Sequence, residues 1–152
     1  MKKVITIIAV LVAFIAVGYA GFNTPTPVPG ASLYDRLGGE QGITELVDEV
    51  VIAHGKNPVI SARFKKYGDQ PERLDMIKKH TVQFFSMGSG GPELYEGRDL
   101  PTTHGGMNIS PAEYMAVVDD ILMVCDNRNI DEKSKNEVLA ILWSLKGMII
   151  AQ

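Results

Sequence analysis

Three histidines are the residues of this sequence best suited to chemistry near neutral pH. They are His54, His80 and His104. His80 comes three residues after Ile77 and four before Phe84, so helical spacing places it on an apolar face. His104 follows the segment Leu-Pro-Thr-Thr and precedes two glycines. Because a neutral imidazole is the commonest metal ligand in proteins, His80 and His104 are candidate metal ligands.

The rest of the sequence limits which metal centre these histidines can serve. The chain has one cysteine and no His-Glu-x-x-His motif, so it lacks the usual ligand sets of zinc enzymes. It also lacks Cys-x-x-Cys-His, which excludes thioether-attached c-type haem. A haem held without covalent bonds needs one axial imidazole and apolar walls. The side chains that can form such walls are Phe64, Ile77, Phe84, Phe85, Leu100 and Met107. On composition alone, a histidine satisfied within the core is the competing interpretation.

The elements that must position these residues read as helices. Apolar residues recur at helical spacing over residues 43–54, 74–85, 114–125 and 138–149. Ser110, Pro111 and Glu113 form a capping box with proline in the first turn. No segment alternates with period two for long enough to indicate a strand, so we predict an all-α domain. Shorter helical turns are expected at 32–37, 59–64 and 101–104.

Length and charge narrow the class of protein. The chain has 152 residues, of which 45% are hydrophobic, and a formal net charge of −3. This is the length of one domain. The acidic balance argues against nucleic acid as a partner, because nucleic-acid binders are usually basic. A single cysteine excludes an intramolecular disulfide framework.

The N-terminal segment has the pattern of an export signal. Lys2 and Lys3 precede an apolar run from Val4 to Val17, and small residues follow it. This predicts a signal peptide over residues 1–20. Because apolar character continues to Phe22 and a membrane span needs roughly 20 residues, a membrane anchor over 4–22 is the alternative. Either one places the folded part outside the cytoplasm, in the periplasm or at the cell surface. Residues 21–31 are proline-rich and predict an extended linker, which leaves 32–152 as the folded domain.

Three blocks of the sequence carry a resemblance to a known family. The first is Ser-Leu-Tyr-Asp-Arg-Leu-Gly-Gly at 32–39. The second is the phenylalanine pair at 84–85, followed by Gly-Gly-Pro and Tyr-x-Gly-Arg within 90–98. The third is His104 with Gly106 and Ile109. Together they resemble the truncated, two-on-two haemoglobins of group I, over about 32–150. The resemblance implies a globin-like, two-on-two helical sandwich around a non-covalent haem b.

The same resemblance assigns roles to individual residues. His104 matches the proximal ligand of the haem iron. Phe64 matches the aromatic that packs on the haem face, and Phe84 and Phe85 match pocket and core aromatics. The residues that fall on the distal side of the haem are Ile77, His80 and Thr81.

The distal side departs from relatives that hold oxygen tightly. Those relatives often carry a tyrosine and a glutamine where this chain has Val51 and Thr81, so we do not expect tight oxygen storage. Some cyanobacterial and algal relatives use a histidine at the position of His80 as a second axial ligand. The resulting hypothesis is a six-coordinate haem held by His80 and His104 when no gas is bound. The alternative is that His80 points outward or contacts a haem propionate.

The resemblance implies reversible binding of O2, NO and CO. Some relatives convert nitric oxide to nitrate, which requires re-reduction of the haem by a reductase or another redox partner. The sequence contains no reductase domain, so it leaves enzymatic turnover open. Electron transfer by a bis-histidine haem and gas or redox sensing are the other functions considered.

The remaining single residues predict ordinary structural roles. We expect His54 to be a boundary residue near the end of its helix, and Asp119 and Asp120 to lie on a solvated face. Cys125 has helical spacing with apolar neighbours, which predicts an inert core thiol. Trp143 can face either the core or a partner.

Overall fold

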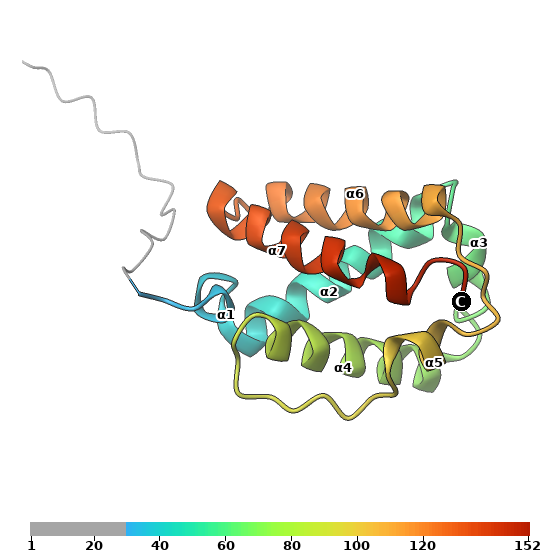
Figure 1. Cartoon of the computed structure of the whole chain (residues 1–152), viewed down its shortest axis with the longest axis horizontal. Helices are drawn as coiled ribbons and strands as arrows, with labels where there is room; N and C mark the ends of the chain where they lie inside the picture. The colour runs from blue at the N-terminus through green and yellow to red at the C-terminus, as the bar shows by residue number, and fades with distance from the viewer. Residues whose placement is uncertain (1–29) are drawn as a thin grey trace, which may run out of the picture.

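The structure, a computed structural model, describes residues 30–152 and is built from helices (Figure 1). Within these residues the only β-type pairing is an isolated parallel bridge between Ile109 and Ile150, so the all-α prediction is confirmed. The helices are α1 (Leu33–Arg36), α2 (Gly39–Lys56), α3 (Ser61–Lys65), α4 (Pro71–Gly88), α5 (Leu100–His104), α6 (Pro111–Asn127), α7 (Glu132–Leu145) and the 3-10 helix η1 (Lys146–Met148).

The predicted export signal or anchor falls on residues that the structure does not describe. The same is true of the linker up to residue 29. Among residues 30–152, no helix combines the length and the apolar character needed to cross a membrane.

The long helices pack as two pairs. α2 packs on α4, α6 packs on α7, and α2 also contacts α6 and so joins the pairs (Figure 1). The short α1 contacts α2 and α7, and α3 contacts α2. The expected two-on-two sandwich of helices is therefore present.

Local signals explain where the helices begin. The side chains of Ser32 and Ser110 each accept a hydrogen bond from the backbone three residues on, and the acidic residue there closes a capping box. Asp131 caps α7 through the backbone of Ser134. Caps of this kind contribute about 1 kcal/mol each. Gly38, at φ +91°, permits the sharp turn from α1 into α2.

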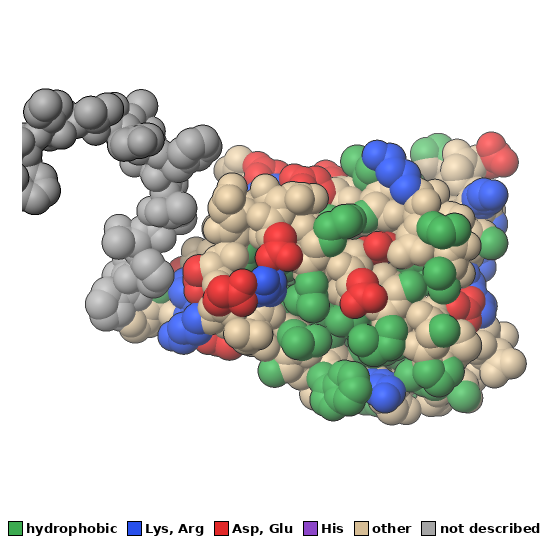
Figure 2. Space-filling model, turned by 90° about the horizontal axis from the view of Figure 1, so that it is seen from above, with side chains coloured by type: hydrophobic (Ala, Val, Ile, Leu, Met, Phe, Trp, Pro, Cys, Tyr) green, Lys and Arg blue, Asp and Glu red, His purple; other side chains and the backbone are tan. Residues whose placement is uncertain are grey.

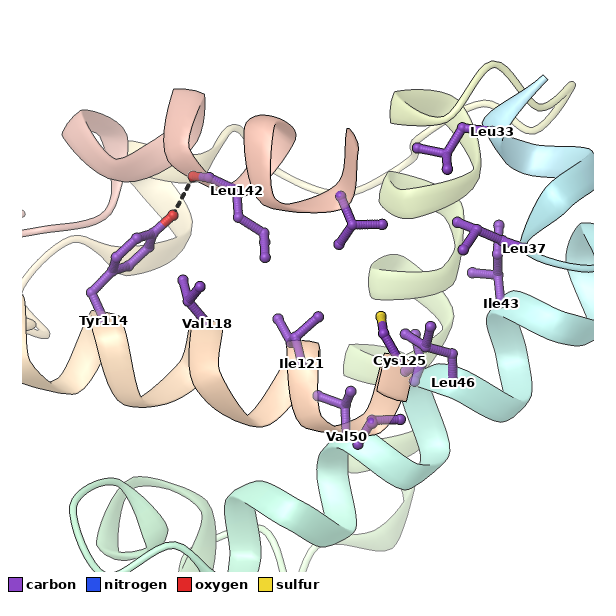
Figure 3. Packing of buried hydrophobic residues seen from close by; sticks show 13 residues of the cluster. Leu33, Leu37, Ile43, Leu46, Val50, Tyr114, Val118, Ile121, Cys125 and Leu142 are labelled. Carbon is purple, nitrogen blue, oxygen red and sulfur yellow. Dashed lines mark hydrogen bonds between the residues drawn. The ribbon is translucent and has the colours of Figure 1, made fainter. Parts of the chain in front are cut away.

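The core lies mainly between α2, α6 and α7 (Figure 3). The hydroxyl of buried Tyr114 donates a hydrogen bond to the carbonyl of Leu142 and ties α6 to α7. Cys125 is fully buried, which confirms the prediction of a core thiol, and burial raises its pKa to about 11. By contrast, α4 has a single buried residue, Ser86. Of the apolar side chains of α4, Val82 and Phe85 pack against this core but remain partly exposed.

Apolar side chains also gather on the surface formed by α6 and α7. Figure 2 looks down on these helices and shows hydrophobic groups among scattered charges. Met115 and Met123 of α6 and Trp143 of α7 are exposed. The ammonium of Lys146 lies 4.4 Å from the centre of the Trp143 ring. Trp143 therefore faces away from the core.

Candidate functional site

His104 ends the five-residue helix α5 and is half-buried. The helix begins at a cap in which Asp99 accepts a hydrogen bond from the backbone of Thr102. The Nδ1 atom of His104 lies 2.8 Å from the carbonyl oxygen of Leu100. Because a carbonyl can only accept, Nδ1 carries the hydrogen, and the lone pair of the neutral ring is on Nε2. This is the tautomer that a histidine ligand needs in order to bind a metal through Nε2.

The predicted distal residues lie along α4 and are half-buried rather than buried. Ile77, Phe84 and Phe85 present apolar surface. The hydroxyl of Thr81 donates to the carbonyl of Ile77 at 2.8 Å, so its hydrogen is used within the helix. Val51, on α2, has no polar atom in its side chain. Neither Val51 nor Thr81 therefore has a free hydrogen-bond donor to offer on this side.

His80 is on α4, and its ring packs against the segment that connects α4 to α5. The ring of Tyr95 lies edge-on to it, with the two ring centroids 6.1 Å apart. The same tyrosine ring is also edge-on to Phe84, with centroids 5.3 Å apart. Glu96 accepts hydrogen bonds from Lys79 and from Gln83 of α4, so the segment is fastened along the helix. Tyr95 belongs to the Tyr-x-Gly-Arg motif, but its packing on His80 was not predicted from the sequence. An aromatic residue in a long loop gives no periodic signal that would place it.

Comparison with known proteins supplies the family. The sequence profile of the family described as bacterial-like globin matches residues 32–151. The chain belongs to this globin family. A group 1 truncated haemoglobin from Nostoc commune is 25% identical over 122 residues, which cover 79% of this chain and 98% of the relative. A group 1 truncated haemoglobin from Tetrahymena pyriformis is 22% identical over 111 residues, covering 73% and 88%.

Solved structures agree on the fold of this globin. The Fe(III) form of the Tetrahymena pyriformis truncated haemoglobin superposes with a TM-score of 0.70 at 20% identity, covering 80% of this chain and all of that one. The cyanomet 2/2 haemoglobin from Synechococcus, which has covalently attached haem, gives a TM-score of 0.67 at 19% identity, covering 76% and 94%. These likenesses establish the two-on-two globin fold.

The donor set of this globin fits a haem better than a bare metal ion. Among residues 30–152, no group of three or more His, Cys, Asp or Glu side chains is placed to hold a metal ion. A haem supplies four nitrogen ligands to its iron and needs only an axial ligand from the protein. His104 can provide that ligand, because its imidazole is in the correct tautomer. The predicted wall residues are half-buried, with apolar surface still to cover, and are Phe64, Ile77, Phe84, Phe85, Leu100 and Met107.

Two structural predictions for this globin were wrong. His54 is not a boundary residue: only 5% of it is exposed, and its Nδ1 atom lies 2.8 Å from Oδ2 of Asp120. Asp120 is not on a solvated face either, because it is 8% exposed and its other oxygen accepts from Asn57 at 2.9 Å. The His54 ring also lies 5.0 Å from that of Phe64. A polar pair from α2 and α6 thus backs the aromatic expected to face the haem.

Proposed function

We propose that this chain binds a non-covalent haem b through His104 and reversibly binds O2, NO or CO at the opposite face. The observation that carries the proposal is the hydrogen bond from His104 Nδ1 to the Leu100 carbonyl. It fixes the ring and leaves Nε2 as the ligand atom. The haem, when bound, supplies an iron that accepts a diatomic gas.

The residues around His104 have supporting tasks. Leu100 and Met107, which are close to His104 in the sequence, and Ile77, Phe84 and Phe85 of α4 would exclude water from a bound haem. Phe64 is backed by the buried His54–Asp120 pair. Val51 and Ile77 carry no donor and Thr81 uses its hydroxyl within α4, so His80 is the residue expected on the distal side that is left to donate to a bound gas. We therefore expect oxygen to be held less tightly than in relatives that carry the distal tyrosine and glutamine.

A gas-binding test separates this function from the alternative. We expect the purified ferrous chain to bind CO saturably, with the absorption change of a ferrous haem–CO complex, and to bind O2. Bis-histidine electron transfer, the alternative, predicts reversible redox cycling with no response to CO. Oxidation of nitric oxide to nitrate is a further activity within the proposal, and it requires an external reductase. Steady nitrate production only when a reductant is supplied would support it.

The coordination of the haem by His80 is a separate part of the proposal. The support for a role as second axial ligand in the absence of gas is the resemblance, together with the half-buried place of His80 on the distal helix, although its ring packs on Tyr95 in this structure. The ferric wild-type chain should then show a low-spin absorption spectrum at neutral pH, and His80→Ala should convert it to high spin. Lys79→Ala is the matched control, since this exposed neighbour pairs with Glu96 and should leave the spectrum unchanged. A wholly high-spin wild type would exclude coordination by His80.

Export of the globin is also part of the proposal. Its support comes from the sequence of residues 1–29, which lie outside the described structure. The basic start and apolar run support delivery of the globin outside the cytoplasm. Cell fractionation should find the chain in the periplasm or the membrane fraction. A start of the mature chain after Ala20 would indicate a cleaved signal, and an intact N-terminus in membranes would indicate an anchor. Recovery in the cytoplasm alone would contradict export.

A further inference from the structure

Arg63 makes three charge-assisted hydrogen bonds that join α3 to the region around His104. Its Nε and Nη2 atoms donate to the two carboxylate oxygens of Glu113, at 2.7 and 3.0 Å. Its Nη1 atom donates to the carbonyl oxygen of Met107 at 2.6 Å. The guanidinium thus fixes both a side chain of α6 and the backbone three residues after His104. Bidentate pairs of this kind are geometrically specific and stronger than single ones.

Glu113 links this contact to the start of α6. Its Oε2 atom also accepts hydrogen bonds from the backbone and the hydroxyl of Ser110, both at 2.9 Å. The Arg63 guanidinium and these Ser110 bonds lower the pKa of Glu113 to about 2. The carboxylate is therefore charged throughout the physiological range. The carboxylate of Glu113 thus completes the capping box of α6 and also accepts the hydrogen bonds of Arg63 from α3.

The segment between His104 and α6 depends on such contacts for its shape. α5 has five residues, and a helix this short is not stable on its own. The segment then turns sharply through Gly106 at φ +75° and Asn108 at φ +47°. The C-terminal residues hold one side of it, since Gly106 and Asn108 donate to the carbonyl of Gln152 at 3.1 and 3.2 Å. Arg63 holds the segment to α3.

We propose that Arg63 is a positioning residue for His104, which holds the segment 105–110 against α3 and thereby keeps the imidazole in place for the haem. This inference rests on the proposed haem function. A plain surface ion pair would contribute little, but Arg63 is two-thirds buried and also binds a backbone carbonyl. When the arginine is lost, the segment samples more conformations, and the bond from His104 to the iron breaks more often.

Arg36 provides a matched control within the same molecule. It also donates to a backbone carbonyl, that of Ala31 at 2.8 Å, and to the carboxylate of Glu137 at 2.5 Å. The bond to Glu137, and a third from Nε to the hydroxyl of Ser134 at 2.9 Å, join α1 to α7, while the bond to Ala31 holds the residue before α1. A variant of Arg36 therefore removes a comparable set of interactions without contacting the segment after His104. It reports what a general loss of stability does to haem binding.

The test measures the rate of haem transfer from the full chain to excess apomyoglobin. We expect Arg63→Gln and Glu113→Gln to lose haem about tenfold faster than the wild type, with Arg63→Lys in between and Arg36→Gln close to wild type. Hydrogen exchange of the haem-free chain is the second readout. Exchange over residues 105–110 should be faster in Arg63→Gln than in Arg36→Gln.

Two results would overturn the role of Arg63. One is a wild-type rate of haem loss in Arg63→Gln, and the other is equal acceleration in Arg63→Gln and Arg36→Gln. Should Arg63→Gln fail to fold, the milder Arg63→Lys and Arg36→Lys give the same comparison. Failure of the underlying haem function is distinguishable, because the wild type itself would then take up no haem.

Discussion

At the scale of single residues, His54 is the histidine that the fold buries, whereas His80 and His104 are half-buried. Burial lowers the pKa of His54, and the hydrogen bond and charge of Asp120 offset part of that effect. The neutral ring donates from Nδ1 to the carboxylate, so the folded state is adapted to an uncharged His54. Asn57 satisfies the second oxygen of Asp120, which explains how a carboxylate is tolerated between α2 and α6.

The lowered pKa of His54 gives stability a definite pH dependence. The unfolded chain, in which histidine has a pKa near 6.5, takes up a proton more readily than the folded chain. The free energy of unfolding should therefore fall as the pH drops below about 6.5. His54→Gln keeps a donor for Asp120 but does not titrate, so its unfolding free energy should fall less over this range. Urea unfolding at pH 7 and pH 5.5 checks this, and an identical fall in both proteins would contradict the role of His54.

At the scale of elements, α2 depends on a close contact with the turn that precedes it. Gly42 is buried in the first part of the helix, and a Cβ atom there would lie 2.0 Å from the carbonyl oxygen of Leu37. The contact is with backbone, which cannot rotate away as a side chain can. Gly55, near the end of the same helix, has no atom within 4 Å of the position that a Cβ would take.

These two glycines should therefore respond in opposite ways to alanine. Alanine is the better helix former, so Gly55→Ala should stabilise the chain by about 0.5 kcal/mol. Gly42→Ala should destabilise it by roughly 1–3 kcal/mol, because the helix or the turn must shift. Thermal or urea unfolding of the two variants measures both effects. A stabilised Gly42→Ala would show that the contact between turn and helix is not close.

The elements themselves were predictable because their signals are local. Ser110, Pro111 and Glu113 predicted the start of α6, and the apolar spacing over residues 74–85 predicted most of α4. The last helix was expected to continue to residue 149, but α7 ends at Leu145 and the tighter η1 follows. Over a single turn, the spacing of apolar residues is too similar in an α-helix and a 3-10 helix to tell which one forms.

At the scale of the whole molecule, the contacts that build the site join positions far apart in the sequence. Asp120 lies 66 positions after His54, and Glu113 lies 50 after Arg63. Periodicity shows which face of a helix is apolar, but it does not show which polar residues of two helices meet. This is why His104 and the wall residues could be proposed from motifs, while the partners of His54 and Arg63 could not.

The central claim is that His104 binds the haem iron, and replacement of its side chain tests it most directly. Because His80 offers a second imidazole, the parent for the test is His80→Ala. The parent should bind added haemin with an intense absorption band near the haem Soret region. The double variant His80→Ala, His104→Gly should bind haemin more than about tenfold more weakly, and added imidazole should restore the band. Equal affinity and an unchanged spectrum in the double variant would contradict the claim.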